Sequence, residues 1–264
     1  MSLLVKIALI AVATLGAWYA LTPPQPPPGA QERVKSGGVE RSFANVVRIH
    51  AFVWKVGLPF PRPRLDVPLT HPLPLSQCSV IASLFAELVA CVFLETYSHH
   101  HHQFPLTFLR MSKQLPLPPH ASALPATFVL ACLTTAASGA LRWACYRTLG
   151  SLFTFELTLR EDHRLVTSGP YAFVRHPSYS GVVLGVVGTL LVHFGPGSWW
   201  ARAGWMGTFQ GQAYALCWCA MEAYVLSSIL CRAPTEDAFL RKQFGAEWDA
   251  WAARVPYRVI PGVF

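Results

Sequence analysis

The chain has 264 residues, of which 53% are hydrophobic and 13% are charged, with a formal net charge of +8. An average soluble domain carries roughly 25% charged residues, so this composition excludes an ordinary soluble fold and favours several membrane-spanning helices. The basic residues form no run interleaved with aromatic residues, and we therefore predict no nucleic-acid partner. The seven cysteines lie mostly within apolar runs and include no CxxC pair, so we predict no metal site.

Residues 1–75 are predicted to form an N-terminal anchor and a proline-rich linker. The apolar run 3–21 is about long enough to cross a bilayer, and a cleaved signal peptide is the alternative interpretation. Within the linker, residues 44–58 are apolar but include Arg48, His50 and Lys55, which would be costly in the middle of a bilayer. We interpret this run as an interfacial amphipathic helix, with a full membrane span as the alternative.

Residues 76–145 are predicted to form two transmembrane helices, at 77–97 and 123–145. Glu87 lies in the middle of the first one, where a carboxylate is expected to face a partner helix or a cavity. The four consecutive histidines at 99–102 favour a solvated loop, and metal binding is the alternative.

Residues 146–264 are predicted to contain a transmembrane hairpin, with spans at 180–198 and 204–230, and a C-terminal tail. The tail has helical spacing from Thr235 to Arg254, where Val255-Pro256 would end a helix. The whole pattern predicts an all-α, polytopic integral membrane protein with about five to six transmembrane helices.

The most polar segment between two apolar runs is residues 161–181, EDHRLVTSGPYAFVRHPSYSG. Gly169-Pro170 and His176-Pro177 interrupt it, so it cannot continue a flanking helix. At membrane depth, such a broken segment is tolerated only when it is buried in protein or lines a wet cavity. The segment is therefore a candidate functional site.

The distribution of basic residues predicts where this segment lies. If the five spans cross the membrane and residues 44–58 do not, 17 of the 21 lysines and arginines fall on one side. Basic loops remain cytoplasmic, so residues 161–181 and the tail would share the cytoplasmic face. We predict that the broken loop and the C-terminal helix meet there and form a cofactor pocket.

Several motifs in these two segments resemble the isoprenylcysteine carboxyl methyltransferase family, over roughly residues 156–262. They are LVTSGPYAFVRHPSYSG, then Arg232 and the run TEDAFL from Thr235, then Phe244-Gly245 and Arg254-Val255-Pro256. The RHPxYxG element also resembles membrane methyltransferases that act on phospholipids.

The resemblance implies a multi-pass enzyme of the endoplasmic reticulum membrane that uses S-adenosylmethionine. It would methylate the C-terminal carboxylate of prenylated cysteine in CaaX-processed, membrane-associated proteins. Arg232 stands where the family holds the substrate carboxylate, and Glu156 stands where the family has a glutamine. Carried over by position, the cofactor contacts would be Glu156, His163, Arg164, Leu165, Val166, Tyr171, His176, Pro177, Ser178, Tyr179 and Glu236.

Elementary chemistry supports an arginine in the role that the family gives to Arg232. A terminal carboxylate is already ionised at neutral pH, so its methylation needs no general base. A guanidinium grips a carboxylate with two parallel hydrogen bonds, although an arginine at the end of a span can also simply extend to lipid phosphate. Glu236 would lie on the same helix face, one turn later.

Two other functions remain open from the sequence. One is a phospholipid or small-thiol methyltransferase with the same membrane fold, and the other is a non-enzymatic membrane scaffold.

Overall fold

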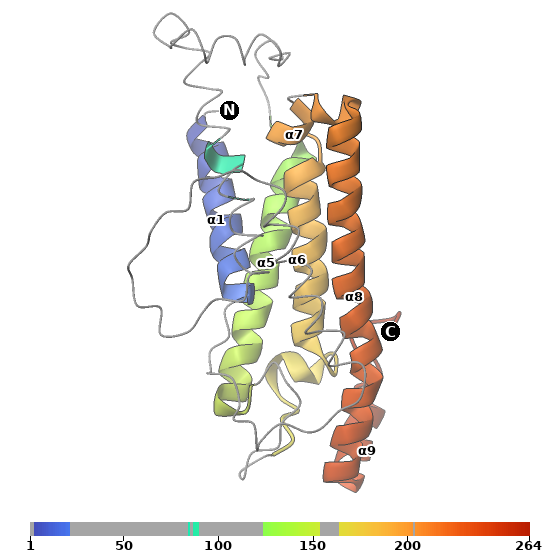
Figure 1. Cartoon of the computed structure of the whole chain (residues 1–264). Coiled ribbons are helices and arrows are strands. Elements are labelled where there is room, and N and C mark those ends of the chain that lie inside the picture. The colour runs from blue at the N-terminus through green and yellow to red at the C-terminus, as the bar shows by residue number, and fades with distance from the viewer. Residues whose placement is uncertain (1–2, 22–83, 85–86, 90–123, 154–163, 203) are drawn as a thin grey trace, which may run out of the picture.

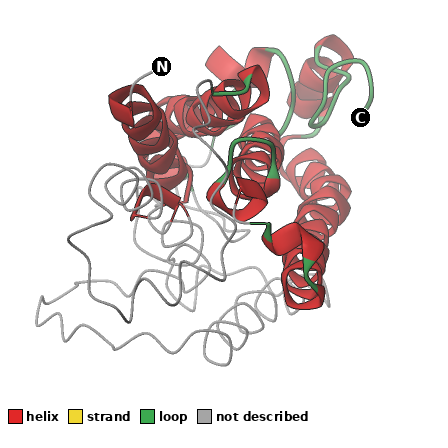
Figure 2. Ribbon diagram, turned by 90° about the horizontal axis from the view of Figure 1, so that it is seen from above, coloured by secondary structure: helices red, strands yellow, loops and turns green. Residues whose placement is uncertain are grey.

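The computed structural model describes residues 3–21, 84, 87–89, 124–153, 164–202 and 204–264. All regular elements among these residues are helices, as Figure 2 shows. The predicted all-α class is therefore confirmed. The predicted interfacial helix at 44–58, the histidines at 99–102 and most of the predicted span at 77–97 lie outside the described residues.

Four long helices form a bundle, in the order α1 (Leu3–Leu21), α5 (Ala126–Leu149), α6 (Pro177–Phe194) and α8 (Phe209–Phe244) (Figure 1). Three stretches of the described chain are long and apolar enough to cross a membrane: Ala126–Leu152, Pro177–Arg202 and Phe209–Phe244. Helix α1 adds a shorter apolar helix over Leu4–Ala20. The chain is thus a polytopic helical membrane protein, as predicted.

Small residues allow α5 to pack closely against both neighbouring helices. A Cβ atom on Gly139 of α5 would collide with the backbone of Gly16 on α1. On the other side, a Cβ on Gly188 of α6 would collide with Thr135. In a membrane, lipid tails are as apolar as the helix side chains, so the hydrophobic effect does not drive helices together. Close backbone packing at small residues is a common alternative means of association.

Helices α6 and α8 begin at residues suited to a helix start. Pro177 is the first residue of α6, a position where the missing N–H costs nothing. The side chain of Thr208 caps α8 by accepting a hydrogen bond from the Gly211 N–H at 3.0 Å. The interruption predicted at His176-Pro177 is therefore a helix start, and α6 begins four residues before Gly181.

The C-terminal tail differs from the prediction of one helix over 235–254. Helix α8 runs without interruption from the predicted span into the tail and ends at Phe244, with Pro234 inside it. Gly245, at φ +52°, then separates it from α9 (Ala246–Arg254). This positive φ suits glycine, which explains why the helix changes direction there. The predicted helix end before Val255-Pro256 is confirmed.

The opposite end of the bundle contains the turn between α6 and α8, with α7 (Trp199–Arg202) and a 3-10 turn at Trp205–Gly207. There, Lys6 of α1 donates to the Gly197 carbonyl at 2.9 Å, and its Nζ lies 3.8 Å from Oε1 of Glu87. Glu87 also accepts from the Trp199 N–H at 2.6 Å. The carboxylate of Glu87 thus faces partners inside the bundle, and these contacts fasten α1 to the α6–α8 turn.

Candidate active site

The broken segment is held at the start of α6 by the C-terminal end of the chain. The backbone N–H of Arg175 donates to the Tyr257 carbonyl at 2.9 Å, and the N–H of His176 donates to the Arg258 carbonyl at 2.7 Å. The hydroxyl of Ser180 donates to the Val259 carbonyl at 2.5 Å. Residues 257–259 therefore satisfy backbone and side-chain donors that would otherwise be unpaired at the N-terminus of α6.

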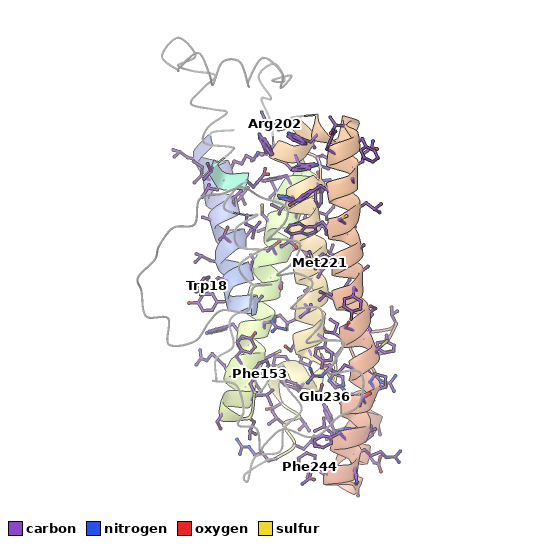
Figure 3. The ribbon with its side chains drawn as sticks, in the orientation of Figure 1. Trp18, Phe153, Arg202, Met221, Glu236 and Phe244 are labelled. Carbon is purple, nitrogen blue, oxygen red and sulfur yellow. The ribbon has the colours of Figure 1, made fainter. Side chains whose placement is uncertain are left out.

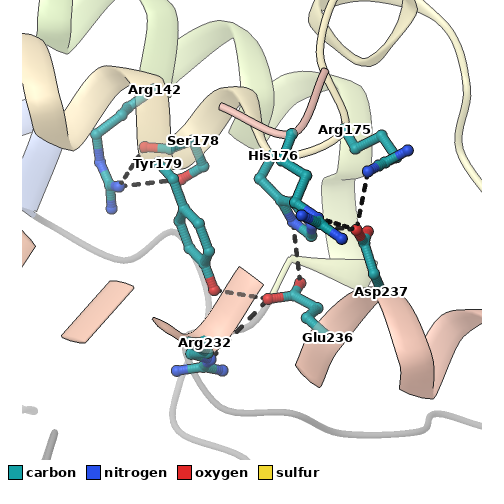
Figure 4. A network of polar contacts seen from close by, with 9 residues as sticks. Arg142, Arg175, His176, Ser178, Tyr179, Arg232, Glu236 and Asp237 are labelled. Carbon is teal, nitrogen blue, oxygen red and sulfur yellow. Dashed lines mark hydrogen bonds and ion pairs between the residues drawn. The ribbon is translucent and has the colours of Figure 1, made fainter. Parts of the chain in front are cut away.

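Asp237 of α8 lies at the centre of a cluster of donors from both polar segments (Figure 4). Its Oδ1 lies 3.0 Å from Nε2 of His176, and its Oδ2 lies 3.1 Å from the Arg175 guanidinium and 2.8 Å from Nε of Arg258. The Asp237 side chain is almost fully buried. Since a carboxylate only accepts hydrogen bonds, Nε2 of His176 carries a proton and its ring orientation is fixed.

Glu236, the residue next to Asp237, makes a second set of contacts. Its Oε2 accepts a hydrogen bond from the Tyr179 hydroxyl at 2.6 Å and lies 3.9 Å from Nε of Arg232. Its Oε1 lies 4.0 Å from Nδ1 of His176. The rings of His176 and Tyr179 are stacked, with centroids 5.3 Å apart. Glu236 thus joins α6 and α8, and its predicted position one turn after Arg232 on the same helix is confirmed.

The two adjacent carboxylates differ in accessibility. The side chain of Glu236 is 27% exposed, whereas that of Asp237 is 6% exposed. Adjacent helical residues point about 100° apart, so Asp237 faces the protein and Glu236 faces the edge of the α6–α8 contact. Asp237 is therefore suited to fixing the site, and Glu236 is suited to binding a cationic or hydroxyl group of a ligand.

A hydrophobic cluster, formed by residues of α5, α8, α9 and the described part of the broken segment, packs beside the polar network. Trp248 and Trp251 of α9 pack with Tyr171, Leu165 and Val166. The indole N–H of Trp251 donates to the Tyr171 carbonyl at 3.1 Å. Burial, together with the neighbouring Cys145 and Glu236, raises the pKa of Tyr171 well above its usual value, so its hydroxyl stays neutral.

The structure brings together some of the predicted site residues and leaves others apart. His176, Pro177, Ser178 and Tyr179 lie at the start of α6. Of these, His176 and Tyr179 contact Glu236 on α8, whereas Ser178 contacts Arg142 on α5. Glu236 lies at the opposite end of the bundle from Arg202 (Figure 3). The predicted meeting of the broken segment and the tail is therefore confirmed.

The remaining predicted residues make no contact in the Glu236 network among the described residues. Leu165, Val166 and Tyr171 belong to the hydrophobic cluster, where Tyr171 is close enough to Glu236 for that carboxylate to raise its pKa, and Arg164 is exposed. Glu156 and His163 lie outside the described residues.

Sequence reasoning gave no role to three residues that hold the site: Asp237, Arg258 and Arg142. Asp237 lies within the TEDAFL motif, and its position beside the candidate residue Glu236 could have marked it as a second candidate. Arg142, which is buried in α5, donates to the carbonyl and hydroxyl oxygens of Ser178 at 3.0 Å each. A charged residue inside a span was its signal, because such residues are costly in a membrane unless they are paired.

Fold and site together define a polytopic helical membrane protein with a buried network of arginine, histidine, tyrosine and carboxylate groups at one end of its bundle. Residues 129–200 match the model of the isoprenylcysteine carboxyl methyltransferase (ICMT) family. They include most of α5, the described part of the broken segment, all of α6 and the first two residues of α7. The family resemblance is thereby confirmed. The matched region ends before α8, so the roles of Arg232 and Glu236 depend on the motif and on the geometry.

Curated relatives carry the same family name. The chain is 33% identical over 118 residues to protein-S-isoprenylcysteine O-methyltransferase B of Arabidopsis thaliana, a stretch that covers 44% of this chain and 50% of the relative. It is 32% identical over 117 residues to the A form from the same plant, covering 44% of this chain and 50% of the relative. A probable protein-S-isoprenylcysteine O-methyltransferase of Oryza sativa subsp. indica is 30% identical over 110 residues, with 41% and 48% covered. The chain spans about half the length of these relatives.

Proposed function

We propose that this protein is a membrane methyltransferase that esterifies the C-terminal carboxylate of prenylated cysteine, with S-adenosylmethionine as the methyl donor. The observation that carries the proposal is the Glu236 network, in which one carboxylate contacts Tyr179 and lies within 4.0 Å of His176 and Arg232. This network combines, at the α6–α8 contact, the two motifs on which the family resemblance depends.

Arg232 is the proposed acceptor-binding residue. It is 7% exposed and lies within α8, a helix apolar enough to cross the membrane. A guanidinium remains charged there and binds a carboxylate in a defined orientation, which positions the acceptor oxygen for in-line displacement. Alignment of this kind can lower a barrier by roughly 7–11 kcal/mol.

The residues around Glu236 fit a donor that carries both cationic and hydroxyl groups. Glu236 is accessible enough to accept hydrogen bonds, and the stacked rings of His176 and Tyr179 offer an aromatic face beside it. When bound, S-adenosylmethionine supplies a methyl group activated on a sulfonium sulfur. The chain's own contribution is to hold Glu236 in place, through Tyr179, and to fix the His176 ring, through Asp237.

Arg232 also favours a carboxylate acceptor over a lipid amine. A phospholipid amine would reach the site as an ammonium, which the guanidinium repels, and it must lose a proton before methylation. A carboxylate is attracted by the same charge and needs no base.

The proposed setting is the endoplasmic reticulum membrane, which the family resemblance implies. The proposed orientation puts the site on the cytoplasmic face, as the distribution of basic residues favours.

The test is methyl transfer by the purified full chain in detergent or nanodiscs. Labelled S-adenosylmethionine is incubated with N-acetyl-farnesylcysteine, with phosphatidylethanolamine or with a small thiol. Label in a base-labile methyl ester supports the proposal. Label in lipid or thioether indicates the alternative methyltransferase, and absence of both labelling and S-adenosylhomocysteine binding indicates a scaffold.

A pair of variants tests the role of Arg232. Arg232→Ala is expected to lose ester formation by about 100-fold or more while binding of S-adenosylhomocysteine changes little, since a charged hydrogen bond to the acceptor is lost. The matched control is Arg241→Ala on the same helix, because Arg241 is exposed and forms its salt bridge with the exposed Asp249. Equal losses in both variants would contradict the assignment.

A further inference from the structure

Arg142 of α5 lies between the N-terminal helix and the start of α6. The Arg142 side chain is buried, and its Nε donates to the Ala20 carbonyl at the C-terminal end of α1. The other side of its guanidinium donates to the carbonyl and hydroxyl oxygens of Ser178, which is the second residue of α6. One side chain therefore joins three helices whose contacting residues are as much as 158 positions apart in the sequence.

Helix ends explain why this arginine is stable at a buried position. The last carbonyls of α1 have no intrahelical partner, and the C-terminal end of a helix favours a nearby cation. Tyr146 completes the arrangement, because its hydroxyl accepts from Arg142 at 2.8 Å and donates to Ala20 O at 2.9 Å. The guanidinium is thus fixed from both sides, as its planar donors allow.

A second observation links Arg142 to the RHPSYSG motif. A Cβ atom on Gly181, the last residue of that motif, would lie 2.5 Å from Cγ and 3.2 Å from Cδ of Arg142. Any side chain at residue 181 would therefore displace the arginine stem. The glycine makes room for Arg142 to reach Ser178, and Ser178 precedes Tyr179, whose hydroxyl donates to Glu236.

We infer that Arg142 is a positioning residue: it holds the first turn of α6 against the end of α1 and so keeps the Tyr179 hydroxyl beside Glu236. The inference rests on the proposed function for its catalytic consequence, but the mechanical link between α1 and α6 stands independently of it. Helix α1 therefore helps to position the site, although it supplies no residue to the Glu236 network among the described contacts.

The experiment compares Arg142→Met, which keeps the length of the stem but removes all donors, with Arg147→Met. Arg147 lies on the same helix but is exposed and stacks on Trp143, so it is the matched control. Hydrogen exchange by mass spectrometry, at equal amounts of monodisperse protein, reports on peptides covering 17–21 and 178–184. We expect faster exchange in both peptides for Arg142→Met and no change for Arg147→Met.

The functional readout is the affinity for S-adenosylhomocysteine and the KM for the methyl donor. Arg142→Met should lower the affinity and raise the KM for the methyl donor, each by on the order of tenfold, since a charged hydrogen bond is lost. The KM for the prenylcysteine acceptor should stay within about twofold of the wild-type value. Arg142→Lys should recover part of this loss, because one ammonium reaches Ala20 or Ser178 but does not hold both.

Each result decides the inference. If the exchange rates of Arg142→Met equal those of Arg147→Met, the inference is overturned, whether or not the protein is a methyltransferase. Failure of the wild type to bind S-adenosylhomocysteine overturns the proposed function instead, and leaves the exchange experiment to judge the link. If Arg142→Met does not fold, Gly181→Ala displaces the same stem without removing the charge. This variant should give smaller changes of the same kind, and unchanged exchange in both peptides would again overturn the inference.

Discussion

Nε2 of His176 lies 3.0 Å from Oδ1 of Asp237, although the two residues are 61 positions apart in the chain. The same carboxylate contacts Arg175 and Arg258, so three side chains from the broken segment and the C-terminal end meet at one buried acidic group on α8. This buried group, together with the more exposed Glu236, holds the broken segment against α8.

Replacing Asp237 with asparagine should destabilise the protein strongly. The substitution keeps the shape but leaves two arginines, one of them buried, without a counter-charge, and breaking a buried pair costs about 3–5 kcal/mol. Because Arg258 is partly exposed, we expect a cost of about 2–4 kcal/mol, measured by thermal or denaturant unfolding in detergent. Asp249→Asn is the control, since Asp249 forms an exposed pair with Arg241 and should change stability by less than about 1 kcal/mol. Similar costs for the two variants would show that the cluster adds no stability.

Replacing Tyr179 with phenylalanine should weaken donor binding while leaving the fold intact. The variant keeps the ring that stacks on His176 and removes only the hydroxyl that donates to Glu236 at 2.6 Å. Loss of one charged hydrogen bond predicts a roughly tenfold lower affinity for S-adenosylhomocysteine, measured by calorimetry. Tyr257→Phe, at an exposed tyrosine, should have wild-type affinity. Unchanged affinity in Tyr179→Phe would mean that Glu236 does not need this donor.

The two tryptophans of α9 should respond differently to the same substitution. Trp251 donates to the Tyr171 carbonyl at 3.1 Å, whereas the indole nitrogen of Trp248 is buried with no hydrogen-bond partner among the described residues. Trp251→Phe should therefore cost about 1–2 kcal/mol more than Trp248→Phe, because it leaves a buried carbonyl unsatisfied. Denaturant unfolding of both variants gives the difference, and equal costs would assign the role of Trp251 to packing alone.

The ion pair at the far end of the bundle tests whether α1 is a permanent part of the fold. Lys6→Met leaves the buried Glu87 without its cation and should cost about 3 kcal/mol. Lys6→Met combined with Glu87→Gln should recover most of that loss, since glutamine still accepts from the Trp199 N–H. Thermal unfolding gives the energies, and intact mass reports whether residues 3–21 remain attached. Removal of these residues from the mature protein would favour the signal-peptide interpretation.

The sequence predicted the meeting of the two polar segments because that prediction needs only topology. Basic residues on one side of the membrane place the loop before α6 and the tail after α8 at the same end. The i,i+4 relationship of Arg232 and Glu236 likewise depends only on helix geometry, and their contact is observed.

The roles of Asp237, Arg258 and Arg142 were not predictable in the same way, because they depend on how the helices are rotated about their axes. Asp237 and Glu236 are adjacent acidic residues, and which of them faces the protein interior is set by the packing of α8 against α6. Arg258 reaches Asp237 because residues 257–259 return to the start of α6, and nothing in the local sequence indicates that return. The separation of α8 from α9 depends on the backbone conformation of Gly245, and a glycine between two helical patterns does not fix its own φ.

The length of α8 has a consequence for the depth at which Arg232 would lie in a membrane. Arg232 is 23 residues beyond Phe209, which puts it about 35 Å along the helix from its start, whereas the hydrocarbon layer is about 30 Å thick. If Phe209 lies at one edge of this layer, the guanidinium lies near the opposite plane, where acyl chains end and headgroups begin. An acid carried at the tip of a bilayer-embedded chain would arrive at that plane without leaving its leaflet.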